Sequence, residues 1–237
     1  MSPAQPMSSR KVAIVTGSAT GVGAAAAIML AERGCNVVIN YTRSKAEAEE
    51  TARACQQHGA ETIVFQGDVG EESACQGMAK AAVDKWGRID YLINNAAKTK
   101  FNPYENLDGL TSEDFLAIYK VNVAGAYQMV RAVVPHMRKL GKGSIVNNSS
   151  IGGVTGIASS MAYAASKAAL NMMTQSLSLV LGPEIRINAI APGAIQTRWL
   201  QGGILPDRYS AGFAAALWAL HPVQTEAVTY IAGRSVS

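Results

Sequence analysis

Tyr163 and Lys167 are the two residues whose types and spacing best suit chemistry. They lie four positions apart in the alanine-rich stretch "MAYAASKAAL", which predicts a helix. Residues i and i+4 share one helix face, with Cβ atoms about 5–6 Å apart, so a phenol and an ammonium can act together. At an effective dielectric of ~20 and a distance of ~5 Å, we expect the ammonium to lower the pKa of Tyr163 by roughly two units. The alternative is that both residues are exposed helix positions without a chemical role.

Ser150 is a second candidate, placed thirteen residues before Tyr163 at the end of the apolar run "GSIVNNSS". A hydroxyl at a strand end can hydrogen-bond the oxygen of a substrate that reacts with Tyr163. Ser149 is its competitor if the register of this strand differs by one residue. The bland alternative is a serine that only shapes the turn after the strand.

Composition indicates one domain and excludes several classes of function. The chain has 237 residues, 49% of them apolar, and a formal net charge of +4, which suits a folded domain over 11–237. The basic residues are scattered, and the densest group, 136–142, is typical of a helix end, so we expect no nucleic acid partner. Cys35, Cys55 and Cys75 lie far apart without a CxxC, which favours reduced thiols in the cytoplasm.

Residues 1–10 are polar and contain proline, and we expect them to be a disordered lead-in rather than a signal peptide. No run reaches the roughly 18 apolar residues of a membrane span, so we expect no membrane partner. The three histidines, His58, His136 and His221, are widely separated. They match no metal-ligand spacing, and we expect no metal.

Apolar runs alternate with helical patterns along the chain. This alternation predicts βαβ units, and two such halves predict an α/β fold with a doubly wound parallel sheet in the order 3-2-1-4-5-6. Gly34, Gly59 and Gly87 are expected to end three of the helices. The predicted strands lie within 11–17, 35–41, 61–69, 88–97, 143–150 and 184–193. The predicted helices lie within 21–34, 44–59, 71–87 and 112–140, followed by the helix that holds Tyr163.

The stretch "TGSATGVG", from Thr16 to Gly23, follows the first predicted strand and opens the first predicted helix. Glycines let a backbone approach a pyrophosphate, and a helix N-terminus offers free N–H groups. The glycine spacing differs from GxGxxG, so the motif by itself leaves a plain strand-to-helix turn open. If it binds a dinucleotide, the end of the second strand chooses between NAD and NADP.

That second strand ends in "VVINYTRSKA", with Asn40 in the place where an acid would bind the ribose hydroxyls of NAD. Arg43 and Ser44 follow it. A guanidinium with a hydroxyl suits the 2′-phosphate of NADP, which a carboxylate would repel. The sequence therefore favours NADP over NAD, with a solvated loop charge as the alternative role of Arg43.

Five motifs together resemble the short-chain dehydrogenase/reductase family over about residues 11–200: "TGSATGVG", "NNAA", "NNSS", "YAASK" and "APGAIQT". The resemblance implies the Rossmann fold and an oxidoreductase in which Tyr163 protonates a carbonyl oxygen, Lys167 orients the ribose and tunes Tyr163, and Ser150 polarises the carbonyl. Asn122 in "KVNVAG" matches the family asparagine that holds a proton-relay water, with a buried structural amide as its alternative. The resemblance implies contacts with the adenine at Asp68, with the ribose at Asn95 and Ala96, and with the carboxamide at Ile195 and Thr197. The positions expected to bind the cofactor are Gly17, Ser18, Thr20, Gly21, Val22, Gly23, Arg43, Ser44, Asp68, Val69, Asn95, Ala96, Tyr163, Lys167, Ile195 and Thr197.

Two departures from the family pattern matter. Ala97 stands where the family's NNAG has a glycine, which affects the fit of the nicotinamide ribose. From about residue 211 the tail "AGFAAALWALHPVQTEAVTYIAGRSVS" is atypical and looks more like a segment of tetratricopeptide-linked membrane proteins. Its "EAVTYIAG" could supply a seventh strand.

Two functions follow from these residues. The leading one is an NADP(H)-dependent enzyme that interconverts a carbonyl and a secondary alcohol, with a small-molecule substrate and a homodimeric or homotetrameric assembly. The alternative is a non-catalytic NADP(H)-binding protein whose substrate pocket the tail leaves incomplete. The sequence names neither the substrate nor the physiological direction.

Overall fold

The computed structural model describes residues 8–195 and 197, and within them the chain forms two compact units. Unit 1 contains residues 8–96, 125–145 and 183–186, and unit 2 contains residues 97–124, 146–182 and the described residues from 187 onward. The predicted phosphate loop belongs to unit 1. Ser150, Tyr163 and Lys167 all belong to unit 2, so each candidate site can be described within its own unit.

The described strands form one six-stranded parallel sheet in the order β3-β2-β1-β4-β5-β6, which confirms the predicted topology. β1 and β2 are buried along their length except at Lys11, because helices cover both faces of the sheet. The strands are β1 (Lys11–Val15), β2 (Cys35–Tyr41), β3 (Thr62–Gln66), β4 (Tyr91–Asn94), β5 (Gly143–Asn148) and β6 (Ile185–Ile190).

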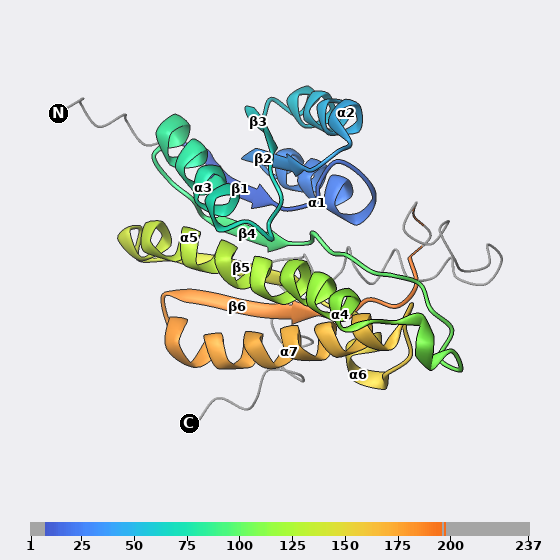
Figure 1. Ribbon diagram of the computed structural model, residues 1–237. Helices are drawn as coiled ribbons and strands as arrows, with labels where there is room; N and C mark the ends of the chain where they lie inside the picture. The colour runs from blue at the N-terminus through green and yellow to red at the C-terminus, as the bar shows by residue number, and fades with distance from the viewer. Residues whose placement is uncertain (1–7, 196, 198–237) are drawn as a thin grey trace. The chain divides into compact units, whose positions relative to one another are not determined.

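The helices of unit 1 pack in two pairs, α1 beside α2 and α3 beside α5 (Figure 1). Their small buried residues, such as Ala26 and Ala27 of α1, allow close packing on the sheet. Gly34, Gly59 and Gly87 adopt positive φ after α1, α2 and α3, as predicted for helix ends. The bounds are α1 (Gly21–Glu32), α2 (Lys45–Gln57), α3 (Glu72–Trp86) and α5 (Ala126–Lys139).

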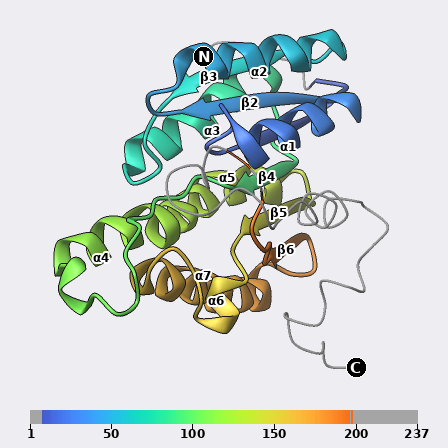
Figure 2. The same cartoon turned by 90° about the vertical axis from the view of Figure 1, so that its right-hand side faces the viewer.

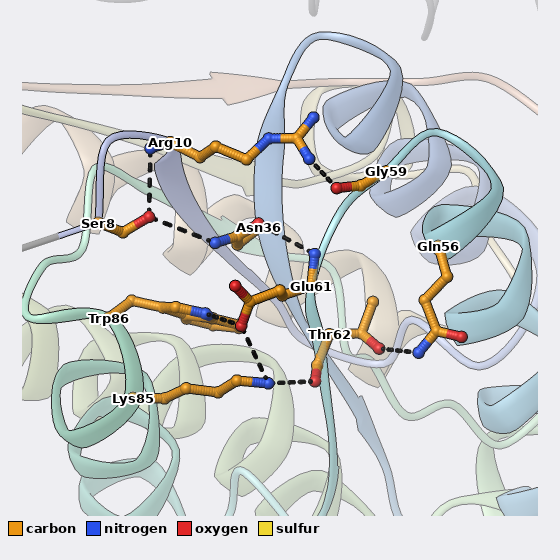
Figure 3. Close-up of polar contacts among 9 residues, drawn as sticks. All are labelled: Ser8, Arg10, Asn36, Gln56, Gly59, Glu61, Thr62, Lys85 and Trp86. Atoms are coloured by element: carbon orange, nitrogen blue, oxygen red, sulfur yellow. Dashed lines mark hydrogen bonds and ion pairs between the residues drawn. The ribbon is translucent and has the colours of Figure 1, made fainter.

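Residues 8–10, which the sequence placed in a disordered lead-in, are held against unit 1 (Figure 3). The Ser8 N–H donates to the carbonyl of Trp86 at 2.9 Å, and the Ser8 carbonyl accepts from Arg88 at 3.1 Å.

The Arg10 guanidinium donates to the carbonyls of Gly34 and Gly59, just past the ends of α1 and α2. Ser8 and Arg10 thus have backbone partners that composition does not show.

Unit 2 is mainly helical, and Figure 2 shows α4, α6 and α7 gathered in it. The single helix predicted over 112–140 is wrong, because a π-helical segment, Lys120–Gly125, separates α4 from α5. Within unit 1, a Cβ at Gly125 would lie 2.8 Å from Val69 Cγ2, so the chain approaches too closely there for a larger residue. The elements of unit 2 are α4 (Ser112–Tyr119), α6 (Gly152–Thr155), α7 (Met161–Leu181) and a 3₁₀ turn at Leu107–Gly109.

The atypical tail from about 211 and its candidate seventh strand lie outside the described residues. Among the residues that are described, no helix has the length and apolar character needed to cross a membrane. The three cysteines are buried free thiols.

Candidate active site

The glycines of the predicted phosphate loop in unit 1 allow a close approach to its backbone. Gly17 and Gly21 both have φ of 59°, a region that L side chains rarely adopt. A Cβ on Gly23 would lie 2.4 Å from the Gly17 carbonyl oxygen, which explains the third glycine of the motif. Thr20 caps α1 without a side-chain hydrogen bond, so the first N–H groups of this helix stay open to an anion. Ser18 is buried and donates to the Val15 carbonyl at 2.7 Å.

These features fit the pyrophosphate of a nicotinamide dinucleotide. The loop from Thr16 to Gly23 has no charged side chain, so an anion there would be bound by N–H groups and by the positive end of the α1 dipole. Gly17, Ser18, Thr20, Gly21, Val22 and Gly23 lie together in this one turn. Positive φ angles at Gly17 and Gly21, and the close approach at Gly23, suit this use of the turn.

Asn95 and Ala96, predicted to contact the ribose, support the loop from β4. The Asn95 side-chain amide donates to the carbonyls of Thr16 and Gly17 at 3.0 and 2.9 Å. The N–H groups of Asn95 and Ala96 both donate to the Thr16 hydroxyl, at 2.9 and 3.0 Å. The structure therefore gives Asn95 a supporting contact with the glycine loop that the sequence did not predict.

Asn40, at the end of β2, has its side chain inside the protein. Its side chain is buried and bonds to the Gly17 N–H and to carbonyls that follow β3. Arg43 is exposed after the strand, and Ser44 caps α2 without a side-chain hydrogen bond. The Asn40 side chain thus contacts the glycine loop and the turn after β3, and strand periodicity alone did not show which way it points.

The remaining predicted cofactor positions divide between the units. In unit 1, Asp68 is exposed, its carboxylate accepts from the Gly70 N–H at 2.8 Å, and Val69 beside it is buried. In unit 2, Ile195 is buried and Thr197 is partly exposed. The predicted adenine contact therefore belongs to unit 1, and the predicted carboxamide contacts belong to unit 2.

Ser150, Tyr163 and Lys167 come together in unit 2. Ser160 caps α7 by accepting from the Tyr163 N–H at 3.3 Å, which places Tyr163 in the first turn of the helix. The Tyr163 hydroxyl hydrogen-bonds the side chain of Ser150. Lys167, one turn further on, lies with its Nζ 5.5 Å from the centroid of the Tyr163 ring.

Ser149 takes a different part from its neighbour. Its hydroxyl is buried and donates to the Lys167 carbonyl at 3.2 Å, so it braces α7. A Cβ on Gly153 would lie 2.6 Å from the Lys167 carbonyl carbon, so glycine also lets α6 pack closely on α7. Of the two candidate serines, Ser150 is the one whose hydroxyl faces Tyr163.

Burial sets the protonation of the pair. Removal from water raises the pKa of Tyr163 to about 12, partly offset by the hydrogen bond from Ser150. Burial also lowers the pKa of Lys167 to about 7, although its Nζ donates to the Asn148 carbonyl at 2.6 Å. The prediction that Lys167 lowers the pKa of Tyr163 is therefore wrong for this chain by itself. Lys167 loses its proton near neutrality, so its charge is gone before the phenol titrates.

Asn122 lies in the π-helical segment, is buried, and uses its whole side-chain amide. Its Oδ1 accepts from the Lys98 N–H at 2.7 Å, and its Nδ2 donates to the Lys98 carbonyl at 3.0 Å and to Ser166 Oγ at 2.9 Å. Ser166 in turn donates to the Tyr163 carbonyl at 2.7 Å. π-helical turns occur often at functional sites, and this one connects Asn122 to the main chain of α7. The sequence analysis missed Ser166, whose only signal is its place beside Lys167.

A glycine-rich strand-to-helix turn in unit 1 and a Ser150–Tyr163–Lys167 cluster in unit 2 are features typical of a dinucleotide-binding oxidoreductase. The chain belongs to the short chain dehydrogenase family, whose model matches residues 11–203. As a member, it is an oxidoreductase that acts on CH–OH groups with a nicotinamide cofactor and a small-molecule substrate.

Individual relatives agree with this assignment. A ketoacyl reductase assigned to the granaticin polyketide synthase of Streptomyces violaceoruber is 40% identical over 190 residues, which are 80% of this chain and 75% of that protein. A solved short-chain dehydrogenase/reductase from Burkholderia xenovorans matches with a TM-score of 0.78 and 41% identity, covering 79% of this chain and 78% of the other. A xylitol dehydrogenase with bound NAD⁺ matches with a TM-score of 0.72 and 34% identity, covering 77% and 70%.

Proposed function

We propose that the protein is an NADP(H)-dependent enzyme that interconverts a ketone and a secondary alcohol, with Tyr163 as its acid and base. The observation that carries the proposal is the hydrogen bond between the Tyr163 and Ser150 hydroxyls beside the buried Lys167. A pair of hydroxyls at one point can hold and protonate one carbonyl oxygen.

In the direction of reduction, the Ser150 hydroxyl donates a hydrogen bond to the substrate oxygen. The Tyr163 hydroxyl then transfers its proton to that oxygen as the carbon becomes an alcohol carbon. NADPH, when bound, supplies the hydride that the carbon accepts. With a pKa of about 12, Tyr163 is protonated at neutral pH before cofactor binds, which is the form that donates a proton.

Lys167 and Asn122 have supporting roles in this proposal. Lys167 binds the nicotinamide ribose and, when protonated, draws the phenol toward ionisation. The Asn122 amide is already engaged by Lys98 and Ser166, so a relay water at this residue is held by its main-chain carbonyl rather than by its side chain.

NADP rather than NAD is proposed as the cofactor because of Arg43. Arg43 is exposed just before α2. It precedes Ser44, the N-cap residue, whose side chain makes no capping hydrogen bond, and no acidic side chain lies between residues 40 and 46. A guanidinium there binds a 2′-phosphate with charge-assisted hydrogen bonds. Separate fluorescence titrations with NADPH and NADH test this choice, and equal dissociation constants contradict it.

We also propose that the protein assembles as a homodimer or homotetramer in the cytoplasm. Phe115, Leu116 and Tyr119 of α4 have 43%, 69% and 50% of their surface exposed, an apolar surface of the kind that subunit contacts cover. Light scattering coupled to gel filtration measures the assembly directly, and a monomer at micromolar concentration contradicts it.

Tyr163→Phe tests the function. Turnover of ketosteroids, quinones, 3-oxoacyl esters or simple aldehydes should fall at least about a hundredfold, because the proton donor is removed. Tyr127→Phe removes an exposed phenol from α5 and is the matched control. Activity of Tyr163→Phe close to wild type contradicts the proposal, and NADPH binding without turnover of any carbonyl by the wild type favours the non-catalytic alternative.

A further inference from the structure

The Asn40 side chain joins three points of unit 1 from a buried position. Only 2% of its surface is exposed. Its Oδ1 accepts from the Gly17 N–H at 3.0 Å, and its Nδ2 donates to the Gly67 carbonyl at 2.9 Å and, more weakly, to the Phe65 carbonyl at 3.4 Å. One amide at the end of β2 thus reaches the phosphate loop on one side and the end of β3 on the other.

The main chain of Asn40 reinforces the same connection. Its N–H donates to Ser18 Oγ at 3.0 Å, and its carbonyl accepts from the Ser18 N–H at 2.9 Å. The start of the glycine loop is therefore attached to β2 by two successive residues, Gly17 and Ser18.

Gly17 is held from its other side by Asn95. The Asn95 amide donates to the Gly17 carbonyl, whereas the Asn40 amide accepts from the Gly17 N–H. Both the N–H and the carbonyl of Gly17 are thus hydrogen-bonded. Its φ of 59° lies in a region that residues with side chains rarely adopt. We call Asn40 and Asn95 the asparagine clamp.

The β3 side of the connection leads to the predicted adenine contacts. The Gly67 N–H donates to the Tyr41 carbonyl at 2.9 Å, while the Gly67 carbonyl accepts from Asn40. Asp68 follows directly and accepts from the Gly70 N–H. Asn40 therefore fixes both the loop for the pyrophosphate and the turn that presents Asp68.

The direction of these hydrogen bonds requires an amide. The contacts need one acceptor toward Gly17 and donors toward Phe65 and Gly67, which asparagine supplies. A carboxylate of the same shape keeps the acceptor, loses both donors, and faces two carbonyl oxygens in a buried place. Leaving buried carbonyls unpaired beside a charge is costly.

We infer that Asn40 is a positioning residue that sets affinity for both nicotinamide dinucleotides and takes no part in choosing between them. The choice then belongs to the exposed residues after β2, with Arg43 foremost. The inference rests on the proposed cofactor, because it concerns the loop that would bind it. It makes an opposite forecast from the view that position 40 is where an acid would select NAD.

Asn40→Asp separates the two views. Kd values for NADPH and for NADH, titrated by fluorescence, should both rise about tenfold or more, and their ratio should stay within about twofold of the wild-type ratio. Arg43→Ala is the matched comparison, and it should raise the Kd of NADPH alone and so change the ratio. Steady-state rates should show a raised KM for NADPH with little change of kcat at saturation, because no reacting group is altered.

Hydrogen–deuterium exchange without cofactor gives a second readout. Amides of residues 16–23 should exchange faster in Asn40→Asp, while those of α7 in unit 2 should keep their wild-type protection. If Asn40→Asp does not fold, as judged by circular dichroism, Asn40→Ala removes the same hydrogen bonds without adding a charge and carries the same forecast.

The inference is overturned if Asn40→Asp binds NADH more tightly and NADPH more weakly, so that the ratio of Kd values shifts tenfold. It is also overturned if loop exchange and both Kd values stay at wild-type levels. A wild-type protein that binds neither dinucleotide instead contradicts the proposed function, so the two failures are distinguishable.

Discussion

The two candidate sites differ in the kind of chemical group that forms them. The phosphate loop of unit 1 has no charged side chain, and neutral amides and hydroxyls hold it in shape. The cluster in unit 2 consists of side chains, and two of its three members titrate, with pKa values moved by burial to about 12 and about 7. Affinity in the first site depends on loop geometry, whereas chemistry in the second depends on protonation.

This contrast teaches where each site is vulnerable. A neutral substitution that alters hydrogen-bond direction should damage the loop and leave the protonation of the cluster unchanged. Removing the buried amino group of the cluster should leave the loop unchanged and lower the activity. It should also stabilise the fold at a pH where that group is charged. The predictions below test this separation, from the largest expected effect to the smallest.

Lys167→Met should lower turnover by about a hundredfold or more, because it removes the amino group beside Tyr163. It should also raise the free energy of unfolding at pH 6.5. The lowered pKa of about 7 means that the unfolded chain binds more protons than the folded one between pH 7 and about 10. Wild-type stability from Lys167 therefore rises with pH in that window, and urea unfolding at pH 6.5 and pH 9 measures it.

Lys142→Met is the control for that experiment, because Lys142 is exposed after α5. It should change neither the activity nor the pH dependence of unfolding. A wild-type protein whose stability relative to Lys167→Met is flat from pH 6.5 to pH 9 contradicts the assigned burial of the lysine charge.

Ser150→Ala should lower kcat about tenfold to a hundredfold with Kd for NADPH unchanged, because the hydroxyl acts on the substrate oxygen. Ser149→Ala is the matched comparison one residue away. It should lose about 1 kcal/mol of unfolding free energy through its bond to Lys167 and keep most of its turnover. Steady-state kinetics and urea unfolding of both variants decide the matter, and equal kcat losses would show that the two serines are not distinguished as described.

Arg10→Ala should have the smallest effect, a loss of about 1 kcal/mol in the free energy of unfolding without a change in kcat. The guanidinium binds carbonyls just past the ends of two helices of unit 1 and does not belong to either candidate site. Arg53→Ala, an exposed arginine within α2, is the control and should be neutral. A drop in kcat for Arg10→Ala would mean that the edge of unit 1 and the chemistry of unit 2 are coupled.

Hydrophobic periodicity predicted the sheet order because buried parallel strands and their covering helices repeat in the sequence itself. The caps at Gly34, Gly59 and Gly87 were predictable for the same local reason, since each needs a positive φ. Hydrogen bonds between residues distant in sequence were not predictable. The break in the helix expected over 112–140 coincides with Asn122 binding the backbone of Lys98, and spacing along a helix holds no sign of that contact.

The sequence predicted which residues of the Ser150–Tyr163–Lys167 cluster lie together better than it predicted their pKa values. The i, i+4 spacing placed Tyr163 and Lys167 on one face, as the structure has them. It did not show that Lys167 is almost fully buried, and burial reverses the expected direction of the tyrosine shift. Asn40 is the parallel case in unit 1, because its residue type was known while the direction of its amide was not.

Arg10 has a practical consequence for following the protein in solution. Trypsin cleaves after arginine only where the side chain and the neighbouring backbone can enter the protease, and here the guanidinium is bound while Lys11 already begins β1. The bond between residues 10 and 11 should therefore resist digestion until this edge of unit 1 opens. The rate of tryptic cleavage between residues 10 and 11 therefore measures how often this part of unit 1 opens, without a label on the protein.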